Sequence, residues 1–316
     1  MNSASSAKTK QSPQIWAVGG GKGGVGKSVV SILLALSLAR QNRRIVLIDA
    51  DLAGANLHTM MGIKTPVRTL NDFVTGKYKT LQEICIPASQ QGMQLICGAS
   101  EIFSLANLPY AQKNKILQSV TQLACDYVIL DLGAGNSYNV LDFFLVADHP
   151  IVVMTPQPTS VQNAYGFIRN TIYRKLSRLA SRKPRLQELI KNAMEPNNDS
   201  QMNTIHDLLN AVSDCSDSGQ VSNFQEAVSE FRPWLITNMT RNGQGNSVAS
   251  IVQNVTGKYL TIRAEELGAI GYDSMIEKRI CQMRPVSGLP ADSEALVNAM
   301  AIVQRLLERG DRDSSQ

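Results

Sequence analysis

The sequence of 316 residues predicts an α/β fold, in which a three-layer, doubly wound and mostly parallel sheet carries helices on both faces. Two observations indicate this class. Short continuous apolar runs, typical of strands that are buried on both faces, alternate with longer segments of helical periodicity. A glycine-rich segment at residues 19–26 directly follows the first apolar run, as in folds that bind ligands at the carboxyl ends of their strands.

The expected strands are short apolar runs bounded by turn residues, at 15–18, 45–48, 93–96, 127–130, 151–154, 234–236 and 267–270. The clearest helical stretches between them are 28–40, 111–124 and 247–258. Because strands that alternate with helices form βαβ units, we expect one large α/β domain at residues 15–308. A flexible segment at residues 1–14 would precede it. A final helix at 295–308 would be followed by a polar tail at 309–316.

Composition excludes several classes of protein. Hydrophobic residues make up 43% and charged residues 18%, which is ordinary for a globular protein and excludes a disordered chain or a coiled coil. The net charge of +5 permits contact with nucleic acid or an anionic membrane. The five cysteines form no CxxC pair, which argues against a disulfide framework or a zinc site and favours a reducing cytoplasm. The polar N-terminus indicates no signal peptide, and no apolar run approaches the length of a membrane span.

Residues 177–231 interrupt the alternation of strands and helices, and we interpret them as a helical and loop insertion. The stretch 169–191 holds eight basic residues and one acid, whereas 192–231 holds seven acids and no lysine or arginine. The two halves could pair with each other or be solvated, which is the simpler interpretation. The alternative is a docking surface for a partner or a membrane.

The strongest motif is GKGGVGKS at residues 21–28, which fits the pattern G-x-x-x-x-G-K-[ST] between a strand and a helix. Glycines let backbone N–H groups turn toward an anion, and the helix N-terminus adds partial positive charge. Lys27 would neutralise the β- and γ-phosphates, and the Ser28 hydroxyl would bind magnesium. The motif therefore predicts a nucleotide phosphate site.

Carboxylates follow two other predicted strands. Asp49 and Asp51 end the second strand, and Asp131 ends the fourth. A magnesium nucleotide site requires a carboxylate at a strand tip, and strand tips converge on one crevice in such a sheet. We expect the three aspartates to lie beside the glycine loop.

Lys22, an extra lysine one residue into the loop, makes the chain resemble the MinD/ParA class of deviant-Walker P-loop ATPases. The resemblance covers nearly the whole chain. Residues 49–57 (DADLAGANL) are similar to the family's switch I, and 131–135 (DLGAG) to its Walker B motif and switch II. It implies a SIMIBI/MinD-like P-loop NTPase fold.

The resemblance also implies a slow ATPase that needs ATP and Mg²⁺. Lys27 would hold phosphates in cis and Lys22 in trans across an ATP-dependent homodimer, and both would take part in catalysis with Asp51, which would position the attacking water. Ser28 would bind the metal, Asp131 would orient it through water, and Asp49 would lie in its outer shell.

Further nucleotide contacts are implied by the same resemblance. They would come from Gly21, Lys22, Gly23, Gly24, Val25, Gly26, Lys27 and Ser28 in the loop, from Asn56 in switch I, and from the strand-end Asn238. Gly271 stands where the family usually has a proline in the adenine loop, and it leaves the local base contact open.

Within the class, residues 131–143 most resemble the FlhG (FleN) branch, MinD-like proteins that control flagellar number or placement. This implies a cytoplasmic switch that positions or counts a cell structure and is stimulated by an unidentified protein partner. It would make peripheral contact with an anionic membrane or a cell pole. The final helix lacks an aromatic tail, which favours core packing over membrane insertion.

Two alternatives stay open. A ParA-type partitioning ATPase would bind DNA non-specifically through a basic patch near its C-terminal helices, where the sequence is only mixed in charge. An iron–sulfur carrier of the Mrp type would use a C-terminal CxxC, which is absent. A related reductase would need paired cysteines, but Cys125 precedes the Walker B strand, on the wrong side for a partner to Cys97.

Overall fold

A single sheet organises the molecule, and the computed structural model describes residues 12–52, 54–88, 90–98, 108–195, 202–215, 218–241 and 245–313. Within these ranges, eight strands are ordered β3-β4-β2-β5-β1-β6-β7-β8. They are β1 (Gln14–Gly19), β2 (Ile45–Ala50), β3 (Ile86–Pro87), β4 (Met93–Ile96), β5 (Tyr127–Leu132), β6 (His149–Met154), β7 (Trp234–Thr240) and β8 (Glu265–Gly271). Neighbouring strands are parallel except β3 and β4. The predicted α/β class with a mostly parallel sheet is confirmed.

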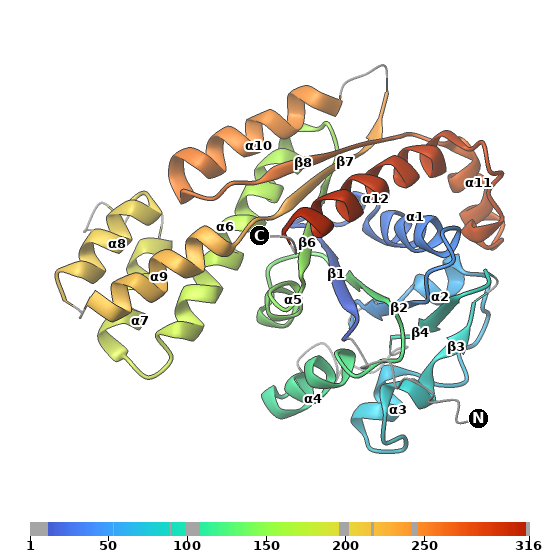
Figure 1. The fold of residues 1–316 in the computed structure, drawn as a ribbon, viewed down its shortest axis with the longest axis horizontal. Helices are drawn as coiled ribbons and strands as arrows, with labels where there is room; N and C mark the ends of the chain where they lie inside the picture. The colour runs from blue at the N-terminus through green and yellow to red at the C-terminus, as the bar shows by residue number, and fades with distance from the viewer. Residues whose placement is uncertain are drawn as a thin grey trace, which may run out of the picture.

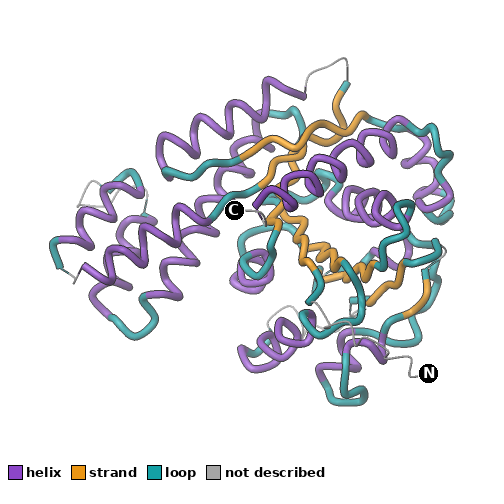
Figure 2. The backbone as a smooth tube through the Cα atoms, viewed as in Figure 1, coloured by secondary structure: helices purple, strands orange, loops and turns teal. Residues whose placement is uncertain are grey.

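Helices cover both faces of the sheet (Figures 1 and 2). They are α1 (Lys27–Ala39), α2 (Leu57–Met60), α3 (Leu70–Val74), α4 (Tyr110–Val120), α5 (Tyr138–Phe144), α6 (Pro158–Leu179), α7 (Pro184–Met194), α8 (Ile205–Ser213), α9 (Ser218–Glu230), α10 (Gly245–Leu260), α11 (Ser274–Cys281) and α12 (Glu294–Asp313). Two 3₁₀ turns lie at Leu81–Ile84 and Val286–Gly288. No helix in the described ranges combines the length and apolar content needed to cross a bilayer.

The pleat of each strand divides the core into two layers. In β1, Trp16 and Val18 pack with the apolar sides of α1 and α12, whereas Ile15 and Ala17 pack with α5, α6 and α10 on the other face. Because both faces are covered, β2 and β5 are buried along their whole length, which explains their continuous apolar sequences.

The order of the strands places a crevice at the end of β1. This central strand pairs with β5 on one side and with β6 on the other, so β2–β5 lie on one side of it and β6–β8 on the other. Such a switch point leaves a space beyond the carboxyl ends of the strands, which is where ligands bind in doubly wound folds. The loop after β1 lies there.

Helices α7, α8 and α9 form a lobe at the left of Figure 1, beyond the sheet. Position 177, where we expected the insertion to begin, lies inside α6, which continues unbroken to Leu179. The lobe has its own buried residues, including Leu186, Ile205 and Phe224. Pairing between the basic and acidic halves is present at Lys175 and Glu230, whose charged atoms are 3.4 Å apart.

The final helix packs in the core, because Ile302, Val303 and Leu306 of α12 are buried. It continues to Asp313, five residues beyond the predicted end at Glu308. Arg309, the first residue of the expected tail, forms an ion pair with Glu265 and lies over the ring of Trp234, and these contacts extend the helix. The flexible segment expected at 1–14 lies largely outside the described residues, and Gln14 already belongs to β1.

Truncation of Ile302 to alanine tests the packing of this helix. Its side chain is buried between α12 and the sheet, so we expect a loss of about 2–5 kcal/mol in the free energy of unfolding. Val297→Ala on the exposed side of the same helix is the control and should change it by about 0.5 kcal/mol or less. Urea denaturation of both variants measures the difference, and equal losses would contradict the packing.

Candidate functional site

The glycine loop between β1 and α1 forms a cradle of backbone N–H groups. Gly24 and Gly26 have positive φ angles of 79° and 85°, which turn the chain sharply before α1. The buried Val25 anchors the loop between them. No side chain caps the first turn of α1, and no acidic residue lies in it. The N-terminus of α1 is therefore suited to bind a phosphate.

Gly26 tolerates no side chain, because an added Cβ would overlap the amide of Asn238. We expect Gly26→Ala to weaken nucleotide binding about tenfold or more, since the loop must shift away from Asn238. Gly24→Ala is a matched control with the same backbone strain, because its φ is also positive but nothing lies within 4 Å of an added Cβ. Titration with a fluorescent ATP analogue compares them, and equal affinities would contradict this role of Gly26.

The two loop lysines point in different directions. Lys27 is buried at the base of the loop, and its Nζ donates to the Lys22 carbonyl at 3.3 Å. Burial lowers the pKa of Lys27, and the negative charges of Asp131 and Asp51 raise it by a smaller amount. Lys22 is partly exposed, and its Nζ donates to Thr159 Oγ1 at the start of α6, at 3.2 Å. The loop thus holds one buried and one outward-reaching ammonium group.

Asp49 and Asp131 are neighbours on adjacent strands, because they face each other in the β2–β5 register. Both are buried. Asp131 accepts hydrogen bonds from the hydroxyls of Ser28 and Ser31, the latter at 2.9 Å. Asp49 accepts from the backbone N–H groups of Asp51 and Leu57, at 3.2 and 2.9 Å. The predicted convergence of Ser28, Asp49 and Asp131 is found.

The electrostatics of this pair fit a cation site. Burial and the charge of Asp131 raise the pKa of Asp49 to about 7, and burial raises that of Asp131 to about 6. A divalent cation beside them would offset both effects. Among the described residues, no three His, Cys, Asp or Glu side chains gather at one point. The donor set is therefore a hydroxyl with one or two carboxylates, which suits Mg²⁺ that also binds phosphate oxygens and water.

Asp51 lies where three loops meet. Its Oδ1 accepts from the Gly54 N–H at 3.0 Å, and a Cβ added at Gly133 would lie 2.8 Å from the same oxygen. Ala134, which follows Gly133, approaches Gly23 of the phosphate loop. The segments after β2 and β5 therefore meet at Asp51, and the segment after β5 also approaches the phosphate loop, where the charge of Asp51 acts on Lys27.

A cavity of about 410 Å³ lies beside the phosphate loop, at the ends of β7 and β8. The buried Asn238 forms part of its wall and donates through Nδ2 to the Val25 carbonyl at 2.9 Å, so its Oδ1 can accept from a ligand. The other lining residues are Val29, Met239, Gly271, Tyr272, Asp273, Ile276, Glu277, Ile280 and Cys281. The size, the apolar wall and the amide suit a nucleotide base.

Gly271 is explained by its neighbours in α12. Its N–H donates to Asn298 Oδ1 at 3.0 Å, and an added Cβ would lie 2.6 Å from Glu294 Oε1. A proline could neither donate nor fit there. Of the cavity residues, the sequence motifs indicate Asn238 and the segment 271–273, whereas no motif in α11 marks Ile276 or Ile280.

Asn56 is the predicted nucleotide residue that lies apart from the others. It is exposed at the start of α2, and its Nδ2 donates to the Gly54 carbonyl of its own loop at 2.8 Å. Its neighbour Leu57, rather than Asn56, contacts Asp49. The described contacts therefore do not join Asn56 to the phosphate loop.

Several known proteins are similar to this chain in sequence. Residues 11–172 match the ParA family model, described as the NUBPL iron-transfer P-loop NTPase. The chain is 28% identical to the antiactivator FleN of Pseudomonas aeruginosa over 93% of this chain and 86% of that protein. It is 33% identical to the flagellum site-determining protein YlxH of Helicobacter pylori over 48% of this chain and 52% of that one.

A solved structure extends the likeness to the fold. The septum site-determining protein MinD of Pyrococcus horikoshii, complexed with Mg-ADP, superposes with a TM-score of 0.61 at 16% identity. The match covers 93% of this chain and 96% of that one. Since the ParA family model matches just over half of the sequence and includes the phosphate loop, the chain belongs to the ParA family of P-loop NTPases.

Proposed function

We propose that this protein is a slow ATPase whose ATP-bound form is a homodimer, and that it works as a switch. The observation that carries the proposal is the division between the two loop lysines. Lys27 is buried beside Asp131, where it can neutralise the chain's own nucleotide, whereas Lys22 reaches out of the loop to Thr159. A lysine directed outward can serve the nucleotide of a second copy.

The remaining site residues divide the work. Ser28, Asp131 and Asp49 would hold Mg²⁺, which when bound neutralises phosphate charge. Asp51, where the three loops meet, would orient the attacking water. Asn238 would accept from the adenine amino group in the cavity beside Val25. We propose no direct contact between Asn56 and the nucleotide.

We further propose that the switch positions or counts a cell structure, as the FlhG (FleN) branch does. The likeness to FleN over most of both chains supports this, and so does the likeness to the flagellum site-determining protein YlxH. A protein partner would stimulate hydrolysis. The proposed place of work is the cytoplasm, with peripheral contact at the inner face of the membrane or at a cell pole.

Imaging of a fluorescent fusion beside its Lys22→Ala variant tests the role. We expect a polar or membrane-associated signal for the wild type that becomes uniform in the variant, because Lys22 would no longer join the two copies. Lys258→Ala, an exposed lysine on α10, is the control and should localise as the wild type does. A uniform signal in all three proteins would refute the spatial role.

The family description favours iron–sulfur carriage as a second candidate. The cysteines support it poorly. Cys97 follows the carboxyl end of β4, whereas Cys125 precedes the amino end of β5. Since both strands run parallel to β2, the two cysteines lie at opposite ends of the strands. Both are buried, and burial raises the pKa of each thiol to about 12. Stoichiometric iron and sulfide after anaerobic reconstitution would favour this candidate.

A DNA-partitioning role is the third candidate. It requires accessible cations near the C-terminal helices, but several arginines there already have partners. Arg305 donates to the Leu267 carbonyl, Arg279 donates to the Pro285 carbonyl at 2.9 Å, and Arg309 pairs with Glu265. ATP-dependent binding to duplex DNA that falls steeply with salt would support this candidate.

A further inference from the structure

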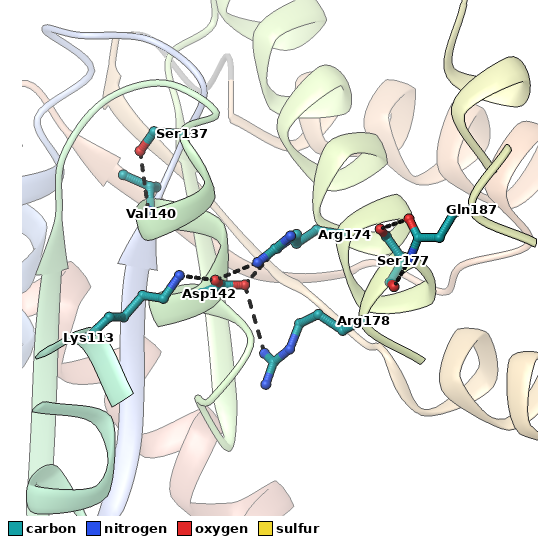
Figure 3. Close-up of polar contacts among 8 residues, drawn as sticks. All are labelled: Lys113, Ser137, Val140, Asp142, Arg174, Ser177, Arg178 and Gln187. Atoms are coloured by element: carbon teal, nitrogen blue, oxygen red, sulfur yellow. Dashed lines mark hydrogen bonds and ion pairs between the residues drawn. The ribbon is translucent and has the colours of Figure 1, made fainter. Parts of the chain in front are cut away.

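A buried carboxylate outside the nucleotide site holds three elements together. Asp142 of α5 accepts from Lys113 of α4 and, in a two-point contact with both bonds at 2.8 Å, from Arg174 of α6 (Figure 3). Arg178, one turn further along α6, lies 3.9 Å from the same carboxylate. The side chains of Asp142 and Lys113 are almost completely buried. Such a cluster fixes α4, α5 and α6 relative to one another.

The cluster carries an excess of positive charge. Burial opposes ionisation of Asp142, but hydrogen bonds from Arg174 and Lys113 lower its pKa below the ordinary value. The carboxylate is therefore charged at neutral pH, and it faces three cations. Two positive charges are left without a matching acid in the cluster. Arg178, whose side chain is 50% exposed, presents this excess to solvent.

Two exposed aromatic rings border the cations. The Arg174 guanidinium lies 4.4 Å from the centre of the Tyr138 ring, and the Lys113 ammonium lies 5.7 Å from that of Tyr110. Tyr138 is 68% exposed and Tyr110 is 71% exposed. Tyrosine and arginine held in place by their neighbours are the residue types that dominate protein interfaces. Two exposed rings, each beside a cation of the cluster, are suited to binding.

We propose that Tyr110, Tyr138, Arg174 and Arg178, together called the Asp142 face, dock an acidic segment of a partner protein. A carboxylate of the partner would pair with Arg178, and its side chains would cover the two rings. A peptide fits better than DNA or a lipid surface, because those ligands need many accessible cations. Here Lys113 is buried, and Arg174 is engaged with Asp142.

The position of the face gives docking a consequence, and this step rests on the proposed function. Helix α5 begins just after the loop that holds Gly133 and Ala134, and Ser137 caps it by accepting from the Val140 N–H at 3.4 Å (Figure 3). A partner seated on Tyr138 would therefore lie next to the loop that passes beside Asp51 and Gly23, and could act on it. The Asp142 face is suited to receive the activator of hydrolysis.

Selection from a random peptide library on the full chain with Mg-ATP tests the proposal. We expect selected peptides to be rich in Asp and Glu. Their affinity should fall about tenfold or more for Tyr138→Ser and for Arg178→Gln, as for an interface hot spot. Arg185→Gln, an exposed arginine on α7, is the matched control and should bind as the wild type does.

Peptides without an acidic excess, or equal binding by all four proteins, would overturn the proposal. Duplex DNA and phosphatidylglycerol vesicles are tested on the same variants. If DNA or the vesicles bind the wild type but not Tyr138→Ser and Arg178→Gln, the face binds a phosphate-bearing ligand instead of an acidic peptide. ATP-dependent dimerisation is measured separately in each sample, so a failure of the proposed switch is distinguished from a failure of docking.

Discussion

Replacement of Asp51 by alanine is expected to lower ATP hydrolysis about 100-fold or more and to trap the ATP-bound dimer. The carboxylate lies where three loops meet, so it can orient water without holding the nucleotide itself. Lys27, Ser28 and Asp131 stay in place, and ATP binding should persist. Phosphate release and size-exclusion chromatography with ATP measure the two effects.

Lys27→Ala is the control that should lose ATP binding as well as hydrolysis. Loss of the buried ammonium removes the charge that neutralises the phosphates, so this variant should neither bind ATP nor dimerise. If Asp51→Ala stays monomeric with ATP while it binds the nucleotide, the switch mechanism is wrong. If it hydrolyses ATP at the wild-type rate, Asp51 has no role in orienting water.

Removal of the Asp142 carboxylate is expected to destabilise the fold by about 3–5 kcal/mol, because Asp142→Ala leaves the buried Lys113 ammonium without its partner. Arg174 would also lose a two-point hydrogen-bonded contact. Urea denaturation of the variant measures the loss. Asp126→Ala, which breaks an exposed pair with Arg44, is the control and should cost about 1 kcal/mol or less.

The pH dependence of the free energy of unfolding gives a second measurement of the Asp142 cluster. The pKa of Asp142 is lower in the fold than its ordinary value of 3.8, so its contribution to stability is present above that value. It is lost as the pH falls through the lower, folded value. The wild type should therefore lose more stability on acidification than Asp142→Ala does. Parallel pH profiles would show that the carboxylate does not stabilise the fold through its charge.

The strands and the phosphate loop could be predicted because their signals are local. Each of the seven predicted apolar runs lies in a strand, since a strand buried on both faces is apolar without interruption. The eighth strand, β3, was missed because it has only two residues, Ile86 and Pro87, and pairs antiparallel at the edge of the sheet. A two-residue strand leaves no periodicity to detect.

Side-chain clusters formed by residues far apart in the sequence could not be predicted in the same way. Asp142 meets Lys113 and Arg174 across 29 and 32 residues, and nothing near any of the three indicates that pairing. The cavity wall in the same way brings Ile276 and Ile280 of α11 together with α1 and the ends of β7 and β8. Asn56 was expected near the nucleotide from its place in a motif, yet its amide is used inside its own loop. Position in a motif does not determine the direction of a side chain.

Helix α6 connects the phosphate loop with the α7–α9 lobe. It is a single helix of 22 residues, so it is roughly 33 Å long. At its near end, Thr159 accepts from Lys22 of the phosphate loop, and its far end leads into the α7–α9 lobe. A tilt of about 5° at Thr159 would move the far end by roughly 3 Å, given that length. A small tilt of α6 at the phosphate loop would therefore displace the lobe by a distance that a partner bound there could detect.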